Sequence, residues 1–421
     1  MKASPIFALG LGYFAVQLIW SLYNAYLPLL YGRFVDSNAV IGLVMIIDNV
    51  ASVTILPFFA ALSDRTHTRL GRRMPFLLAG ASLAAVLFAL IPRAPGFVPL
   101  LGATLLMNVG VAVFSGPGMA LMPDLTPPPL RGRVNGTLNF MGGLGALAAF
   151  FAVSPLHRRS PSLPFDVTAV VTVIALVVIV LTIREQHAPL PAPRRGLVCG
   201  RRATGGAEAG DAPEVGHILP AVRDLLRGRH RRVLFVLLVG LTSVAAVNGV
   251  QNMFTRYGVN YLRLDAPAAT FLLGSFALAF IVFSVPAGYL GDRFDRLPVI
   301  RLGLAGTLAA FVMVATASDP GLSLGLFALG GLSWSLVVAN SYPLLVNLTP
   351  PGQAGVYSGL WIGAVAMGGL IAPPVYGWVV DLLGFRAFFL PGVGFLALAL
   401  LLSLGIPRSG DAEARASPAG A

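Results

Sequence analysis

The chain has 421 residues, of which 56% are hydrophobic and only 11% are charged. In soluble proteins about a quarter of all residues are charged, and these cover the surface. The composition of this chain therefore excludes a soluble globular protein and favours one that lies in a bilayer. The net charge of +12 does not indicate a nucleic-acid binder, because the cations lie in short segments between apolar runs rather than on one basic domain.

Apolar runs long enough to cross a membrane recur along the whole chain. About 20 apolar residues span the hydrocarbon core. The sequence therefore predicts an all-α, polytopic membrane protein with twelve transmembrane helices in two six-helix halves. The first run is too long for the apolar region of a signal peptide, so we expect a permanent span there. The expected spans are 6–31, 39–62, 74–92, 97–122, 134–153, 166–183, 233–257, 267–290, 298–317, 321–346, 354–380 and 386–406.

The segments between the spans predict orientation and domain boundaries. Most lysines and arginines lie in alternate segments, which places both termini in the cytoplasm and indicates a multi-pass protein of the plasma (cytoplasmic) membrane. We expect an N-terminal half over 1–183, a cytoplasmic linker over 184–232, a C-terminal half over 233–406 and a disordered cytoplasmic tail over 407–421. Within the linker, 215–232 spaces apolar residues on one helical face with arginines opposite, which is typical of an amphipathic helix at the membrane surface.

The two halves repeat each other. The Leu-Thr-Pro-Pro sequence at 125–128 recurs at 348–351, and Ser-Asp-Arg at 63–65 is matched by Gly-Asp-Arg at 291–293. Parallel repeats of six spans place a solute path at their interface, near the membrane midplane. The residues alone therefore predict a two-lobed protein that moves a small solute by alternating access.

Charged loops at equivalent places in the halves predict conformational gating. The loop 63–75 (SDRTHTRLGRRMP) holds one aspartate and four arginines. An aspartate there can pair with an arginine or a helix end in one state and release it in the other. Topogenic positive charge would explain the arginines but not the matched aspartates. The expected gating residues are Asp64, Arg65, Arg69, Arg72, Arg73, Asp124, Arg131, Asp292 and Arg293.

The loop 63–75 and its weaker copy at 288–296 (GYLGDRFDR) resemble the gating motif of the major facilitator superfamily. More narrowly, the blocks 56–76 (LPFFAALSDRTHTRLGRRMPF) and 115–145 (SGPGMALMPDLTPPPLRGRVNGTLNFMGGLG) resemble bacterial members of the sucrose/proton symporter group, within the glycoside–pentoside–hexuronide:cation symporters. The resemblance implies proton-driven transport of a sugar, a disaccharide such as sucrose or maltose, by a protein that works as a monomer.

Asp48 is the acid best placed for proton coupling. Where plant sucrose symporters carry a coupling aspartate this chain has Asn108, and where they carry a nearby arginine it has Met119. Asp48 lies inside the second expected span, whereas Asp166 and Asp381 lie at span edges. An acid inside a span is costly and usually faces the solute path. The alternatives are a sodium ligand and a structural carboxylate that ties two helices; the lack of a second acid in that span favours protons over sodium.

Polar and aromatic side chains within the spans are candidate contacts to a sugar. Amides bond sugar hydroxyls, and aromatic faces pack against the apolar side of a ring. Asn248 and Asn252 share one face of the seventh span. Such groups also tie helices together or form interfacial belts. The candidate substrate contacts are Tyr13, Gln17, Trp20, Asn24, Asn49, Asn108, Asn139, Asn248, Gln251, Asn252, Arg256, Asn340, Tyr357 and Trp361.

The sequence has no residue pattern typical of a metal site, an ATP-binding loop or an enzyme active site. The five histidines lie in expected loops without metal-ligand spacing, and no glycine-rich loop with lysine is present to hold ATP phosphates. We therefore expect no enzyme, no cofactor, no metal site and no nucleic-acid partner; the expected partners are the solute, protons and the bilayer. The main alternative to sugar import is a proton-coupled exporter of drugs or metabolites on the same fold. A receptor or lipid-handling protein without turnover is a third possibility.

Overall fold

The protein is helical throughout the part that the computed structural model describes, with no strand in those residues. The described residues are 3–66, 68, 70–183, 223–225, 227, 230–317, 319–350 and 353–406, without the side chains of 3, 4, 48, 51–53, 128 and 320. Most of the expected linker helix, the tail over 407–421 and Arg69 lie outside them. The α-helices are α1 (Ala3–Tyr31), α2 (Asn38–Met45), α3 (Ile47–Arg65), α4 (Met74–Leu90), α5 (Phe97–Leu125), α6 (Arg131–Ala148), α7 (Leu163–Thr182), α9 (Arg231–Asn260), α10 (Ala266–Phe294), α11 (Arg296–Thr316), α12 (Pro320–Leu348), α13 (Ala354–Leu383) and α14 (Leu390–Leu404).

Eleven of the described helices are long and apolar enough to cross a membrane. The expected second span, 39–62, is the exception, because the helix breaks at Ile46 into the short α2 and the longer α3. α2 has its own start, at which the Ser37 side chain caps the first turn, and α3 carries charged residues at both ends. With this broken segment as the twelfth, the expected all-α fold of twelve transmembrane segments is confirmed.

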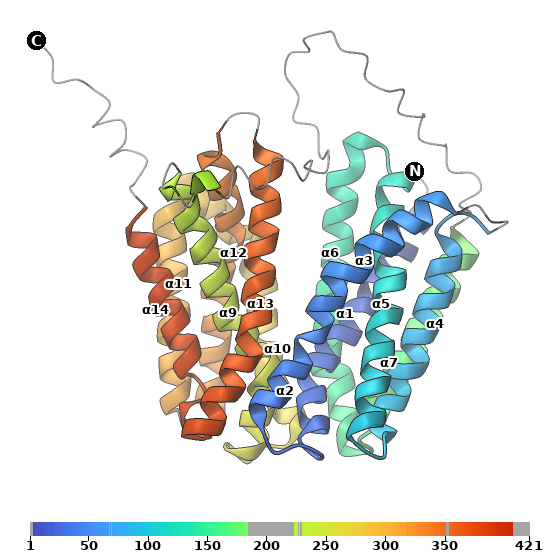
Figure 1. Ribbon diagram of the computed structural model, residues 1–421, viewed down its shortest axis with the longest axis horizontal. Coiled ribbons are helices and arrows are strands. Elements are labelled where there is room, and N and C mark those ends of the chain that lie inside the picture. Colours follow the sequence, from blue (N-terminus) through green and yellow to red (C-terminus); the bar gives the residue numbers. More distant parts are fainter. Residues whose placement is uncertain are drawn as a thin grey trace, which may run out of the picture. The chain divides into compact units, whose positions relative to one another are not determined.

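The helices cluster into two compact units. The first comprises Met1–Leu22 and Ile47–Asp211, and the second comprises Tyr23–Ile46 and Ala212–Ala421. The units therefore differ from the expected halves at Tyr23–Ile46, because the end of α1 and all of α2 pack with the C-terminal helices. Figure 1 shows this for α2, drawn in blue, which lies against the orange α13.

In the first unit, α5 packs closely against both α4 and α3. A Cβ added at Gly80 of α4 would lie 2.7 Å from the carbonyl oxygen of Gly110 on α5, so only glycine permits this approach. Phe88 and Phe165, both fully buried, pack with ring centroids 5.0 Å apart between α4 and α7. Close backbone contact with α5 and aromatic packing against α7 together fix α4 in the bundle.

In the second unit, aromatic side chains fix α9 against its neighbours. Tyr257 of α9 stacks on Phe388 with ring centroids 4.8 Å apart, and Phe254 meets Phe327 of α12 edge-on at 4.6 Å. The Tyr376 hydroxyl of α13 donates a hydrogen bond of 2.7 Å to a backbone carbonyl of α9. Buried aromatic pairs of this kind contribute packing area and a preferred geometry.

Candidate functional site

An apolar cavity of about 90 Å³ lies within the first unit, between α1, α4, α5 and α7. Only Tyr13, Ser115 and Thr172 bring hydroxyl groups to its lining, and the other side chains are aliphatic, aromatic or sulfur-containing. Small-molecule sites typically combine a mostly apolar surface with a few polar groups. The lining residues are Leu9, Gly12, Tyr13, Ala15, Val16, Leu77, Ala81, Phe114, Ser115, Gly118, Met119, Thr172, Ala175, Leu176 and Ile179.

Small residues open this cavity and large ones wall it. Glycine or alanine stands in the lining on each of the four helices. At Gly118 of α5, no heavy atom lies within 4 Å of the position that a Cβ would take, so there is open space beside this residue. Phe114 on the same helix and Leu176 on α7 supply bulk to the walls.

Two of the hydroxyl groups differ in how they are satisfied. Thr172 Oγ1 donates to the carbonyl oxygen of Thr168, one turn earlier on α7, at 2.8 Å. Ser115 Oγ is buried and makes no hydrogen bond to the described residues. A buried hydroxyl without a partner carries a desolvation cost that a ligand oxygen can relieve.

The other candidate contacts of the first unit do not line this cavity. Gln17 and Asn139 are exposed, Trp20 and Asn49 are half-buried, and Asn108 is buried. Of the candidate substrate contacts in the first expected span, the structure thus brings Tyr13 alone to the cavity.

A second polar group forms in the second unit, where amides of α1 and α9 come to the same level. Arg256 of α9 donates from Nη1 to the carbonyl oxygen of Pro28 on α1 at 3.2 Å. One turn earlier on these helices lie Asn252 and Asn24. Asn252 Nδ2 donates to the carbonyl oxygen of Asn248 at 2.9 Å, whereas Asn24 Oδ1 is buried and accepts no hydrogen bond from the described residues. Gln251, on the adjacent face of α9, is exposed.

Arg256, predicted as a substrate contact, is committed to a polar network at the start of α2. It is 7% exposed, and its Nε donates to Asn38 Oδ1 at 2.8 Å. The Asp381 carboxylate of α13 also bonds Asn38. Its Oδ1 accepts hydrogen bonds from the Asn38 backbone N and from Asn38 Nδ2, at 2.7 and 2.8 Å. Its Oδ2 accepts hydrogen bonds from the Ser37 hydroxyl at 2.7 Å and from the Ala39 backbone N at 2.9 Å. The carboxylate therefore caps α2, since it meets the unpaired N–H groups of a helix start.

Close backbone contact reinforces this docking of α2 on α13. A Cβ at Gly42 of α2 would collide with the carbonyl of Pro373, and a Cβ at Gly377 of α13 would collide with the carbonyl of Asn38. The sequence signal for the cap, Ser37-Asn38 before an apolar run, was readable. Its partner Asp381 was missed as a site residue, because a contact across more than three hundred residues leaves no local pattern.

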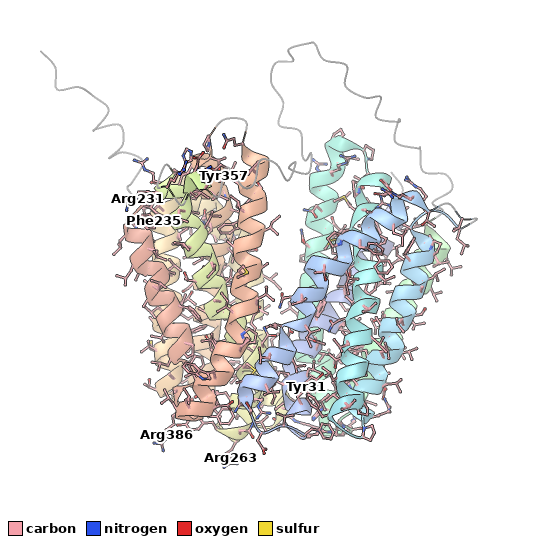
Figure 2. All side chains as sticks on the ribbon, viewed as in Figure 1. Tyr31, Arg231, Phe235, Arg263, Tyr357 and Arg386 are labelled. Atoms are coloured by element: carbon pink, nitrogen blue, oxygen red, sulfur yellow. The ribbon has the colours of Figure 1, made fainter. Side chains whose placement is uncertain are left out.

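The remaining candidates of the second unit make helix-packing contacts. Asn340 Nδ2 donates to the carbonyl oxygens of Ala287 on α10 at 3.0 Å and Leu336 at 2.9 Å. The Trp361 ring lies against Gly240 of α9. Figure 2 shows Tyr357 with Arg231 and Phe235 at one end of the second unit, while Tyr31, Arg263 and Arg386 lie at its other end.

The Tyr357 ring is buried and lies 6.2 Å from that of His230, between ring centroids. Tyr357 is thus at an end of its unit, away from the amides of α9.

Around the loop between α3 and α4, four of the expected gating residues form one ion cluster, to which α5 contributes Asp124. Arg73 Nη2 lies 2.9 Å from Asp124 Oδ2 and 3.1 Å from Asp64 Oδ1, and Arg72 lies 3.4 Å from Asp124. The Arg73 side chain is only 6% exposed, against 15% for Asp124 and 58% for Asp64. Arg131 instead donates to the carbonyl oxygens of Thr126 and Pro123, at 3.3 and 3.4 Å.

The repeated loop in the second unit is arranged differently. Asp292 pairs with Arg296 at 2.6 Å, one turn on, and its side chain is 66% exposed. The Arg293 guanidinium lies 5.5 Å from the centre of the Phe294 ring. The two residues expected to gate this copy therefore make separate, local contacts.

The acid expected to couple protons lies at the helix break. The backbone of Asp48 is in the first turn of α3, two residues after Ile46, and its side chain is outside the described part. Among the described residues there is no group of three or more His, Cys, Asp or Glu side chains able to hold a metal ion.

Two curated proteins show what the chain is similar to in sequence. It is 26% identical over 188 residues to the tetracenomycin C resistance and export protein of Streptomyces glaucescens, covering 45% of this chain and 35% of that protein. It is 30% identical over 197 residues to the class E tetracycline resistance protein of Escherichia coli, covering 47% and 40%. The chain therefore matches well under half the length of these relatives.

Solved structures of transporters share the fold. A bacterial homologue of the human lysosomal transporter Spinster, in an inward-facing and occupied conformation, matches with a TM-score of 0.73 at 12% identity, over 95% of this chain and 96% of that one. The nucleoside transporter NupG matches with a TM-score of 0.74 at 11% identity, over 96% and 100%. At such identities the likeness concerns the fold.

The sequence model that matches covers nearly the whole chain. It is that of the Major Facilitator Superfamily, and it matches residues 9–274 and 258–421. The family accounts for the repeated halves and the multi-pass helices. This chain therefore belongs to the Major Facilitator Superfamily, as a secondary transporter of the membrane and not an enzyme.

Proposed function

We propose that the protein exports apolar or amphipathic organic molecules in exchange for protons. The observation that carries this proposal is the apolar cavity of the first unit, with its three hydroxyl-bearing residues. Sites for drug-sized ligands measure about 300–1,000 Å³. A cavity of about 90 Å³ has room for one ring or a short chain of such a molecule, and the rest of the ligand must lie outside it.

The curated relatives support this direction of transport. The two proteins named above are an antibiotic export protein and a tetracycline resistance protein. Each is matched over less than half of its length, so their activities serve here as models for the proposal. They favour export over the sugar import that the loop blocks at 56–76 and 115–145 suggest.

Asp48 is the carboxylate that we assign to proton coupling. Binding and ion sites of secondary transporters are typically formed where a transmembrane helix is broken. The break at Ile46 precedes Asp48 by two residues, which places this acid at such a point. The Arg73 cluster is the gate in this scheme, and we expect a monomer with both termini in the cytoplasm.

Uptake into inside-out membrane vesicles tests the proposal. With the vesicle lumen held more acidic than the outside, so that protons leave it as the solute enters, wild-type vesicles should accumulate labelled tetracycline, and collapse of the gradient should stop accumulation. Asp48→Asn should remove gradient-driven accumulation but leave exchange of tetracycline at equal concentrations on both sides. Wild-type vesicles that accumulate no more than vesicles without the protein would contradict the exporter.

Proton-coupled symport of a disaccharide is the second candidate, and the amides of the second unit favour it. Asn24, Asn248, Gln251 and Asn252 are hydrogen-bonding groups of the kind that sugars use, and Asn24 Oδ1 accepts no bond from the described residues. Labelled sucrose and maltose should then enter liposomes under an inward proton gradient. Uptake of either sugar, without movement of tetracycline, would replace the first proposal by the second.

A further inference from the structure

Ser115 differs from the three buried threonines of α5 and α7 in the first unit. Thr104, Thr168 and Thr172 each donate to a backbone carbonyl one turn earlier, all at 2.8 Å. Ser115 Oγ, equally buried from solvent, has no such bond within the described chain. A rotation about one side-chain bond is enough to turn a serine hydroxyl, so Ser115 can present it to a molecule in the cavity that it lines.

The size of the cavity limits what that molecule is. An apolar cavity of roughly 150 Å³ holds benzene. The cavity here, about 90 Å³, is lined by Phe114, Leu77 and Leu176 among others, and opens beside Gly118. This volume is smaller, so one ring fills it and extends into the open space beside Gly118, with the rest of the ligand outside. An acyl chain of a lipid would also fill it, but would offer Ser115 no partner.

We propose that the cavity is the subsite for one ring of the transported molecule, and that Ser115 selects a ring that carries a hydrogen-bond-accepting oxygen. This inference rests on the proposed export of apolar molecules. It adds the substrate class, a cyclic ketone, phenol or aryl carbonyl compound, and a specificity-determining residue. The oxygen accepts the Ser115 hydroxyl proton while the ring packs against the apolar walls.

Two probes of equal shape test the selection by Ser115. Acetophenone and α-methylstyrene differ in one group, a carbonyl in place of a methylene, and their affinities for the purified protein can be compared by saturation-transfer NMR. We expect the wild type to prefer acetophenone by about 3- to 10-fold, the range of one neutral hydrogen bond. Ser115→Ala should bind both equally, and Ser115→Thr should keep the preference. Equal binding by the wild type, or a preference that persists in Ser115→Ala, would overturn the proposal.

Two glycines of α5 test the location. Gly118 and Gly102 both have open space around a Cβ, so a leucine at either leaves the backbone packing intact. Only Gly118 lines the cavity. Gly118→Leu should abolish binding of both probes, whereas Gly102→Leu should bind them as the wild type does. Binding retained in Gly118→Leu would show that the ring lies elsewhere.

The outcome for this subsite is separable from that for export. If acetophenone is preferred through Ser115 but no solute is driven across the membrane, the proposed export is wrong and the subsite stands. If tetracycline is exported by Ser115→Ala and Gly118→Leu as by the wild type, export stands and this cavity is not on its route.

Discussion

Two copies of one loop, at the ends of α3 and α10, use their arginines in different ways. In the first copy Arg73 lies buried between two carboxylates, those of Asp64 and Asp124. The offset that relates Ser-Asp-Arg at 63–65 to Gly-Asp-Arg at 291–293 puts Arg301, in α11 just beyond the second copy, where the first copy has Arg73. Arg301 donates to the carbonyl oxygens of Ser403 and Ile406 at 2.6 and 2.9 Å. The offset that relates the Leu-Thr-Pro-Pro repeats puts Asn347 where the first copy has Asp124.

The arginine is present in both halves, but the groups that it contacts differ, and we infer that its role differs with them. Where α5 supplies a carboxylate, the arginine forms a charged cluster that can be made and broken, as a gate requires. Where α12 supplies an amide instead, the arginine satisfies backbone carbonyls at the end of α14, where a cation is favoured by the helix dipole. We infer that the first copy gates and that the second copy stabilises a helix end.

Arg73→Ala should have the largest effect. It leaves Asp124, 15% exposed, without its main counter-charge, and removal of one partner from a buried ion pair costs about 3–5 kcal/mol. The exposed Asp64 adds little to this, because solvent screens it. We expect the low end of that range and a melting temperature lower by about 5–10 °C in detergent. Arg73→Lys, which keeps the charge but not the forked geometry, should fall between; an unchanged melting temperature in Arg73→Ala would contradict the cluster.

Asp124→Asn gives the first copy the amide that the second copy has at Asn347. Arg73 keeps Asp64 and the carbonyl of Pro117, so we expect a loss of about 2 kcal/mol, smaller than for Arg73→Ala. A double-mutant cycle between Asp124→Asn and Arg73→Ala measures the pair directly. The two losses should be far from additive. Full additivity would mean that these side chains do not interact.

Arg301→Ala should act only on the second unit. It removes two hydrogen bonds from a charged donor to the end of α14, for which we expect a loss of about 1.5 kcal/mol, the low end of the range for charged groups. Amide hydrogen exchange should rise at residues 403–406 and stay unchanged around the loop 63–75. Equal increases in amide hydrogen exchange in both regions would contradict the inference that Arg73 and Arg301 have different roles.

Asp292→Asn should have the smallest effect. Its pair with Arg296 is exposed and one helical turn apart, and pairs of this kind contribute about 0.3–0.5 kcal/mol or less. Neither the melting temperature nor transport should change measurably. A loss of transport in Asp292→Asn, with a normal melting temperature, would mean that the second copy gates as well.

Much of the fold was predictable from the sequence, because a transmembrane helix can be recognised from a local run of about 20 apolar residues. Eleven expected spans coincide with single long helices. The break at Ile46 was not expected, since no proline or glycine stands there, and the packing of α2 against α13 has no local signal in the sequence. The assignment of Tyr23–Ile46 to the second unit depends on the same packing.

The site was less predictable, because it depends on which helices meet. The charge pattern of the loop 63–75 was enough to name Asp64 and Arg73 as gating residues, and Asp124, which lies outside that loop on α5, was named beside them without a predicted contact. Arg256 was chosen for its polarity inside a span, and the structure commits its Nε to Asn38. The apolar cavity left no signal in the sequence, since leucine, alanine and glycine on four helices look alike whether they enclose a space or fill it.

The direction in which protons move with the solute tests the central claim most directly. Proteoliposomes that hold a pH-sensitive dye are given tetracycline outside, with no other gradient imposed. The exchange of solute for protons predicts that the lumen becomes more alkaline than in protein-free liposomes, and that Asp48→Asn abolishes this change. A lumen that instead becomes acidic when sucrose or maltose is added, with no response to tetracycline, would contradict export and establish sugar symport.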